Sequence, residues 1–177
     1  MAAIDLIVLG MLRKESLSAY DIQKLIEFRH ISKWVKISTP SIYKKVISLE
    51  EKGFIKVRSA KEGRTVEKAV YSITEAGKRE FERLMLEVSS EPINIFLDFN
   101  AVIVNLDYLP AEEQLACLTG IEDNIKRLKA FLKDNISEKK DMPGIPETGF
   151  AVLQQQYMLA QAIEKWFASL QAATRNV

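Results

Sequence analysis

The hydrophobic pattern of this chain changes period at Gly53, and this change constrains the fold more than any other feature. Before this glycine, apolar residues recur at spacings of three and four, which predicts a helix with one buried face over residues 39–53. After it, apolar and polar residues alternate in two short runs around a charged turn, which predicts a β-hairpin over residues 54–73. A helix therefore leads directly into a hairpin.

Both ends of the helix over residues 39–53 carry recognisable signals. Thr39 is predicted as the N-cap, and Pro40 suits the first helical position because its missing N–H has no intrahelical partner there. Gly53 suits the left-handed conformation that ends many helices. The face expected to be buried carries Ile42, Val46 and Leu49.

A second face of this helix is cationic and carries small hydroxyl groups. Its members are Ser41, Lys44, Lys45 and Ser48, with Tyr43 beside them. Ammonium groups suit phosphates, and short polar side chains let a helix sit deep in the major groove, so this face is predicted to bind double-stranded DNA. The alternative is that Lys44 and Lys45 only keep a surface helix in solution.

Two further helices are predicted before residue 39. Apolar residues at helical spacing indicate one helix that ends near Lys14, and residues 15–18 read as a turn. Ser18 is expected to cap the next helix, with Asp21 in its first turn. Three helices followed by a hairpin predict a winged helix-turn-helix domain over residues 1–90. The same order also serves protein-interaction modules without a DNA role, which stays the alternative.

Charge is distributed unevenly along the chain. The net charge is only +1, yet residues 1–90 hold 17 Lys+Arg against 12 Asp+Glu, whereas residues 91–177 hold 8 against 12. The basic surplus coincides with the predicted recognition helix and wing, as expected for a surface that binds a polyanion. Three basic residues near the hairpin tip are predicted DNA contacts: Lys61, Arg64 and Lys68.

Residues 91–177 are predicted to form a mainly helical dimerisation domain, which makes the fold class mainly α. Pro92 is expected to start a helix that is apolar nearly all round and therefore buried, and Pro110 to start another. Residues 137–147 read as a linker, and a last helix from about Phe150 to Ala172 is the predicted homodimer clasp. The two apolar seams comprise Leu118, Ile121, Ile125, Leu128 and Leu132, then Val152, Leu159, Ile163, Trp166 and Leu170.

Aromatic residues in this second half suggest an effector site. Phe96, Phe99 and Trp166 are the candidate contacts for a small aromatic or hydrophobic molecule. The motive is an apolar stretch from Ile93 to Leu109 that also carries Asn94 and Asp98. The alternative is that the aromatic side chains belong to the core and the two polar ones face solvent.

The composition argues against catalysis, metal binding and membrane insertion. His30 is the single histidine and Cys117 the single cysteine, so histidine or cysteine metal clusters and an internal disulfide are excluded. The 7 glycines form no phosphate-binding loop. The most apolar run is interrupted by polar residues and is too short to cross a membrane. We therefore expect a cytoplasmic protein that is not an enzyme and has no cofactor.

Several short segments of the first half occur together in a known order: residues 7–12, 17–22, 41–43, 49–55, Arg64 and 70–77. Through them the chain, over about residues 4–84, resembles the PadR family of bacterial transcriptional regulators. The resemblance implies a dimeric regulator that binds operator DNA, usually as a repressor that a small molecule releases. Phe54 stands where the family usually has leucine after the glycine. A regulator that has no effector is a further alternative.

Overall fold

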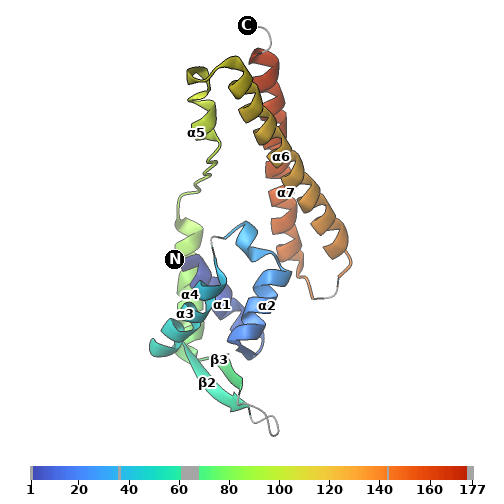
Figure 1. Cartoon of the computed structure of the whole chain (residues 1–177). Helices are drawn as coiled ribbons and strands as arrows, with labels where there is room; N and C mark the ends of the chain where they lie inside the picture. The colour runs from blue at the N-terminus through green and yellow to red at the C-terminus, as the bar shows by residue number, and fades with distance from the viewer. Residues whose placement is uncertain (1, 36, 61–67, 143, 175–177) are drawn as a thin grey trace. The chain divides into compact units, whose positions relative to one another are not determined.

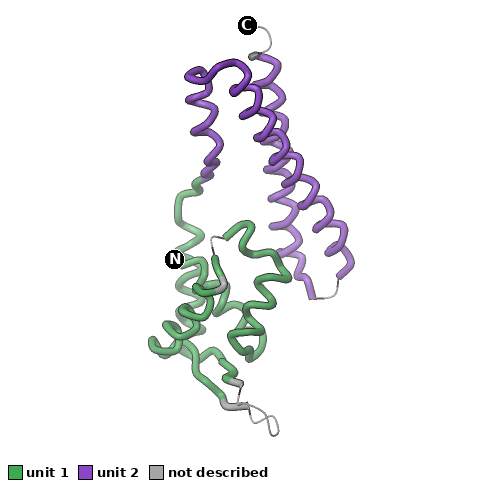
Figure 2. The backbone as a smooth tube through the Cα atoms, viewed as in Figure 1, with its two compact units in different colours: residues 1–94 green, residues 95–177 purple. Residues whose placement is uncertain are grey.

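The chain divides into two compact units, residues 1–94 and residues 95–177 (Figure 2). The computed structural model describes residues 2–35, 37–60, 68–142 and 144–174. Three helices, a small sheet and a fourth helix make up the first unit, and the second unit is helical (Figure 1). Within the described ranges, no helix is long and apolar enough to span a bilayer.

The helices of the first unit are α1 (Ala2–Lys14), α2 (Ala19–Phe28), the short η1 (Ile31–Lys33), α3 (Thr39–Glu51) and α4 (Glu75–Ser90). They enclose one apolar core, whose most deeply buried members are Val8, Leu9, Ile22, Ile42, Val46, Leu49 and Ile55. The predicted buried face of α3 is therefore confirmed. Burial of these side chains, each contributing about 1.5–3 kcal/mol, is what holds α3 in the unit.

The described strands form an antiparallel sheet in the order β1–β3–β2. β2 (Ile55–Ala60) and β3 (Lys68–Ile73) are the two arms of the predicted hairpin, with Ile55 opposite Ile73. The predicted turn over residues 15–18 is wrong in part, because Leu17 and Ser18 form β1 and pair with β3. A strand of two residues is too short to show an alternating pattern in the sequence.

The helix caps follow the sequence signals with one exception. The hydroxyl of Ser18 accepts a hydrogen bond from the N–H of Asp21, and the carboxylate of Asp21 accepts one from the N–H of Ser18. Gly53 has a φ of 72°, as predicted for a left-handed helix end. The N-cap of α3 is Ser38 rather than Thr39, because Thr39 already has helical geometry; Pro40 is still within the first turn.

The residues after α4 do not form the predicted buried helix from Pro92. In the described stretch over residues 91–110, only α5 (Asn100–Ile103) and η2 (Leu106–Tyr108) are helical, and Ile93 and Phe96 are 92% and 85% exposed. The stretch contains short polar side chains, which can bond to the backbone and compete with helix hydrogen bonds. The amide of Asn94, for example, donates to the carbonyl oxygen of Pro92 at 3.2 Å.

Two long helices, α6 (Ala111–Lys139) and α7 (Glu147–Thr174), pack against each other in the second unit. Their shared core is built on Ile121, Ile125 and Phe167, with Leu118, Ile163 and Leu170 partly buried around it. The predicted linker over 137–147 is shorter than expected, because α6 continues to Lys139. The predicted last helix is confirmed and is longer than residues 150–172 at both ends.

Candidate nucleic-acid interface and effector pocket

Helix α3 is anchored on one side and open on the other. Opposite its buried face, Tyr43 and Ile47 are 40% and 53% exposed, and Lys44 is exposed as well. Lys44 forms no ion pair with any residue that the structure describes. Its charge is therefore available to a ligand of the first unit.

Lys45 is held within the protein instead. Its Nζ atom lies 2.7 Å from Oδ1 of Asp5 on α1, and the two side chains are only 17% and 16% exposed. A pair this well shielded from water is much less screened than a surface ion pair. The structure thus gives the Lys45 ammonium a structural partner, although the sequence pattern placed it beside Lys44 on the cationic face.

Ser41 is also engaged by the backbone of its own helix. Its hydroxyl donates to the carbonyl oxygen of Ser38 at 2.6 Å and accepts a hydrogen bond from the N–H of Ser38 at 2.9 Å. These two bonds fix the first turn of α3, where backbone groups otherwise lack partners. Ser48, further along the same face, is partly buried.

The Tyr43 side chain connects α3 to α2. Its hydroxyl donates to Oε1 of Gln23 at 3.2 Å, and the amide of Gln23 donates to Glu27 at 2.7 Å. The hydrogen bond from Gln23, together with the neighbouring Lys24, lowers the pKa of Glu27. Tyr43 is thereby oriented by a short chain of exposed polar groups. The sequence pattern did not predict Gln23, because nothing in it shows which residue of α2 faces α3.

The wing extends the basic surface beyond α3. Lys56 and Arg58 on β2 are both exposed. Two predicted contacts, Lys61 and Arg64, lie outside the described residues. Lys68 begins β3, but its side chain also lies outside the described part of the structure.

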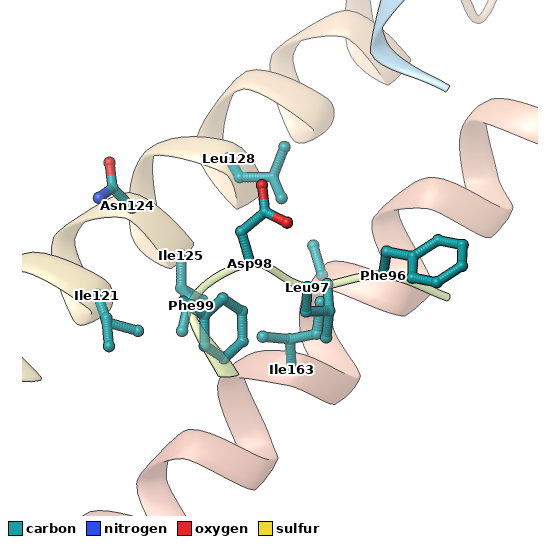
Figure 3. A pocket seen from close by; sticks show the side chains of 10 residues that line it. Phe96, Leu97, Asp98, Phe99, Ile121, Asn124, Ile125, Leu128 and Ile163 are labelled. Atoms are coloured by element: carbon teal, nitrogen blue, oxygen red, sulfur yellow. The ribbon is translucent and has the colours of Figure 1, made fainter. Parts of the chain in front are cut away.

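The second unit contains a pocket of about 320 Å³ between the segment at residues 96–99 and the helices α6 and α7 (Figure 3). Its lining residues are Phe96, Leu97, Asp98, Phe99, Ile121, Asn124, Ile125, Leu128, Ala160 and Ile163. The volume is at the small end of the range for ligand sites, and the lining is mostly apolar. Two of the three predicted effector contacts, Phe96 and Phe99, are among these residues.

Trp166 lies next to this pocket without lining it. Its ring centroid is 5.9 Å from that of Phe99 and 6.2 Å from that of Phe167. Aromatic pairs at this separation attract each other, so Trp166 supports the wall that Phe99 forms. The sequence did not identify the lining residues of α6 and α7, since they converge only through the packing of the two helices.

Comparison with known proteins places these features in context. The family model described as a winged helix DNA-binding domain matches residues 15–91. The negative transcriptional regulator PadR of Bacillus subtilis (strain 168) is 25% identical over 134 residues, covering 76% of this chain and 71% of that protein. This chain is a homologue of the PadR regulators. The resemblance in the first half of the sequence is therefore confirmed.

Several solved structures share the fold over nearly the whole chain. The crystal structure of Bacillus subtilis PadR in complex with operator DNA has a TM-score of 0.82 at 22% identity, covering 97% of this chain and 98% of that one. The complex of the same regulator with p-coumaric acid has a TM-score of 0.80 at 21% identity, covering 96% and 97%. The Vibrio cholerae virulence activator AphA has a TM-score of 0.73 at 20% identity, covering 98% of each chain. The winged helix and the helical second half predicted from the sequence are both present in this shared fold.

Proposed function

We propose that this PadR homologue binds operator DNA through α3 and the wing, and that it regulates transcription. The observation that carries the proposal is that one face of α3 is buried in the unit while the other is exposed. One face and the Lys45–Asp5 pair fix the helix in the unit, while Tyr43 and Lys44 remain exposed. A recognition helix must be held rigidly by its domain and must also present polar side chains to the DNA. The solved complex of Bacillus subtilis PadR with operator DNA supports the same use of the fold.

The residues of this interface have different roles in the proposal. Lys44, with Lys61, Arg64 and Lys68 of the wing, contacts phosphates and supplies most of the affinity. Tyr43 and Ser48 face the base edges and contribute to sequence preference. Ser41 and Lys45, in contrast, position α3 through their contacts inside the unit.

The second proposal is that the protein works as a homodimer joined through its C-terminal helices. Packing on α6 leaves part of α7 uncovered, since Met158 is 67% exposed, Leu159 38% and Trp166 43%. Large apolar side chains exposed together along one helix indicate a surface for another copy. Two winged units set about one helical turn of DNA apart would then read two half-sites, which a single unit could bind only weakly.

The third proposal is that a small hydrophobic effector releases a repressor from DNA by binding in the pocket of the second unit. The size and apolar lining of that pocket support it. The Bacillus subtilis relative is described as a negative regulator, and one of its structures contains p-coumaric acid. The pocket also favours this view over a regulator that has no effector.

DNA binding can be tested without knowing the operator. A duplex is selected from a random-sequence library with the full-length protein, and its affinity is measured by fluorescence anisotropy over a range of salt concentrations. We expect a selected sequence whose binding weakens steeply with salt. Failure to select any sequence, together with salt-insensitive binding, would contradict the proposal and favour a protein-interaction module.

A further inference from the structure

We infer that the pocket of the second unit takes an apolar molecule carrying a cationic amine, with the ammonium group beside the carboxylate of Asp98. This inference rests on the proposed effector role of the pocket and specifies the chemistry of the effector. It depends on the charge of the lining, which the apolar shape alone does not define.

Among the described residues that line the pocket, Asp98 is the one charged side chain. It forms no ion pair with any residue of the described ranges. The rest of the lining consists of aliphatic and aromatic side chains and the amide of Asn124. A ligand that fills this space therefore meets a negative charge at one edge of an otherwise apolar surface.

The neighbouring charges on α6 and α7 do not neutralise Asp98. Lys129 is paired with Glu164 at 2.5 Å, and Lys126 with Glu122 at 2.6 Å. Arg127, also on α6, donates to the side-chain oxygen of Asn124 at 2.8 Å. These three cations of α6 are thus directed to other groups, and no ion pair within the described ranges occupies Asp98.

Phe99, which follows Asp98 in the chain and also lines the pocket, suits a cation as well. Figure 3 shows the Asp98 carboxylate on the Leu128 side of the segment and the ring of Phe99 on the opposite side, among aliphatic side chains of the pocket, while the ring of Phe96 points away. The faces of aromatic rings attract cations, and a carboxylate next to apolar surface attracts them more strongly than one in bulk water. An anionic ligand in the same place would meet repulsion from Asp98, which discriminates against free carboxylic acids.

The inference can be tested with three probes that share one ring system and differ in charge. They are 1-naphthylmethylamine, 1-naphthoic acid and 1-naphthalenemethanol, each titrated into the full-length protein by isothermal calorimetry in the absence of DNA. We expect the amine to bind about tenfold or more tightly than the acid, with the neutral alcohol between them.

Two variants and one control test whether Asp98 is the charge that causes the preference for the amine. Asp98→Asn should weaken amine binding by about tenfold and leave the alcohol within about twofold, which also shows that the pocket is intact. Phe99→Ala should weaken all three probes. The control is Asp107→Asn, because Asp107 is an exposed acid of the same segment that does not line the pocket.

The variant Arg127→Gln distinguishes an amine held by Asp98 from an anionic ligand held by Arg127. If Arg127 anchored an anionic ligand, its removal would weaken the acid; we expect the amine to bind as tightly as before or more tightly. Preference for the acid, an unchanged amine affinity in Asp98→Asn, or no binding of any probe would overturn the inference. DNA binding is measured separately, so amine binding without DNA binding would refute only the proposed regulatory function.

Discussion

The ammonium group of Lys45 on α3 lies 2.7 Å from the carboxylate of Asp5 on α1, and both side chains are largely shielded from solvent. This pair joins the proposed reading helix to the first helix of the chain. Two adjacent lysines therefore differ in environment, since the side chain of Lys44 is exposed.

The first prediction concerns this ion pair. Lys45→Ala and Asp5→Ala should each lower the free energy of unfolding by about 1–3 kcal/mol, because each leaves a shielded charge without its partner. Chemical denaturation of the single and double variants forms a cycle that isolates the coupling. Additive effects of the two substitutions would show that the pair contributes nothing.

The second prediction concerns Lys44. Lys44→Ala should weaken binding to the selected duplex and reduce the slope of log affinity against log salt by about one unit, as expected for one lost phosphate contact. Lys133→Ala, an exposed lysine of α6, is the control and should leave the slope unchanged. An unaltered slope in Lys44→Ala would place this residue outside the interface.

The third prediction concerns Gly77 in the first turn of α4. A Cβ atom there would lie 2.0 Å from the carbonyl oxygen of Phe54, so Gly77→Ala should destabilise the first unit by about 3 kcal/mol. Gly120 on α6 has nothing within 4 Å of an added Cβ. Gly120→Ala should therefore stabilise the second unit by about 0.5–1 kcal/mol, through better helix propensity. Thermal unfolding of both variants tests the contrast.

The fourth prediction concerns the dimer. Truncation after Asp141 would remove Phe167 from the core of the second unit, so a surface change is the cleaner test. Leu159→Glu and Met158→Glu should leave the packing of α6 on α7 intact, because both side chains are exposed, and should shift the protein toward monomer in light scattering. Gln161→Glu, at an exposed position of the same helix, should remain dimeric. A monomeric parent protein would refute the dimer itself.

The first unit was largely predictable because its signals are local. The spacing of Ile42, Val46 and Leu49, the alternation after Gly53 and the cap at Ser18 each depend on residues that are close in the sequence. The ion pair of Lys45 with Asp5 could not be predicted in the same way. Its partner Asp5 is 40 positions earlier, and only the folded unit brings the two together.

The second unit is harder to predict from the sequence, because a stretch rich in apolar residues need not be buried. The stretch after Pro92 is rich in apolar side chains, yet Ile93, Phe96 and Tyr108 are at least 85% exposed. Hydrophobicity alone does not separate a core segment from a surface that another molecule covers. The pocket was anticipated only through its aromatic residues, since its α6 and α7 wall depends on how two helices pack.

Thr74 links the end of α3 to the start of α4 through its side chain and its backbone. Its hydroxyl donates to the carbonyl oxygen of Gly53 at 2.7 Å, while the backbone N–H of Thr74 donates to the carbonyl oxygen of Phe54 at 3.0 Å. These two hydrogen bonds connect the end of α3, the base of the wing and the start of α4 at a single residue. We therefore expect a movement of the first turn of α4 to move the end of α3 and the base of the wing with it.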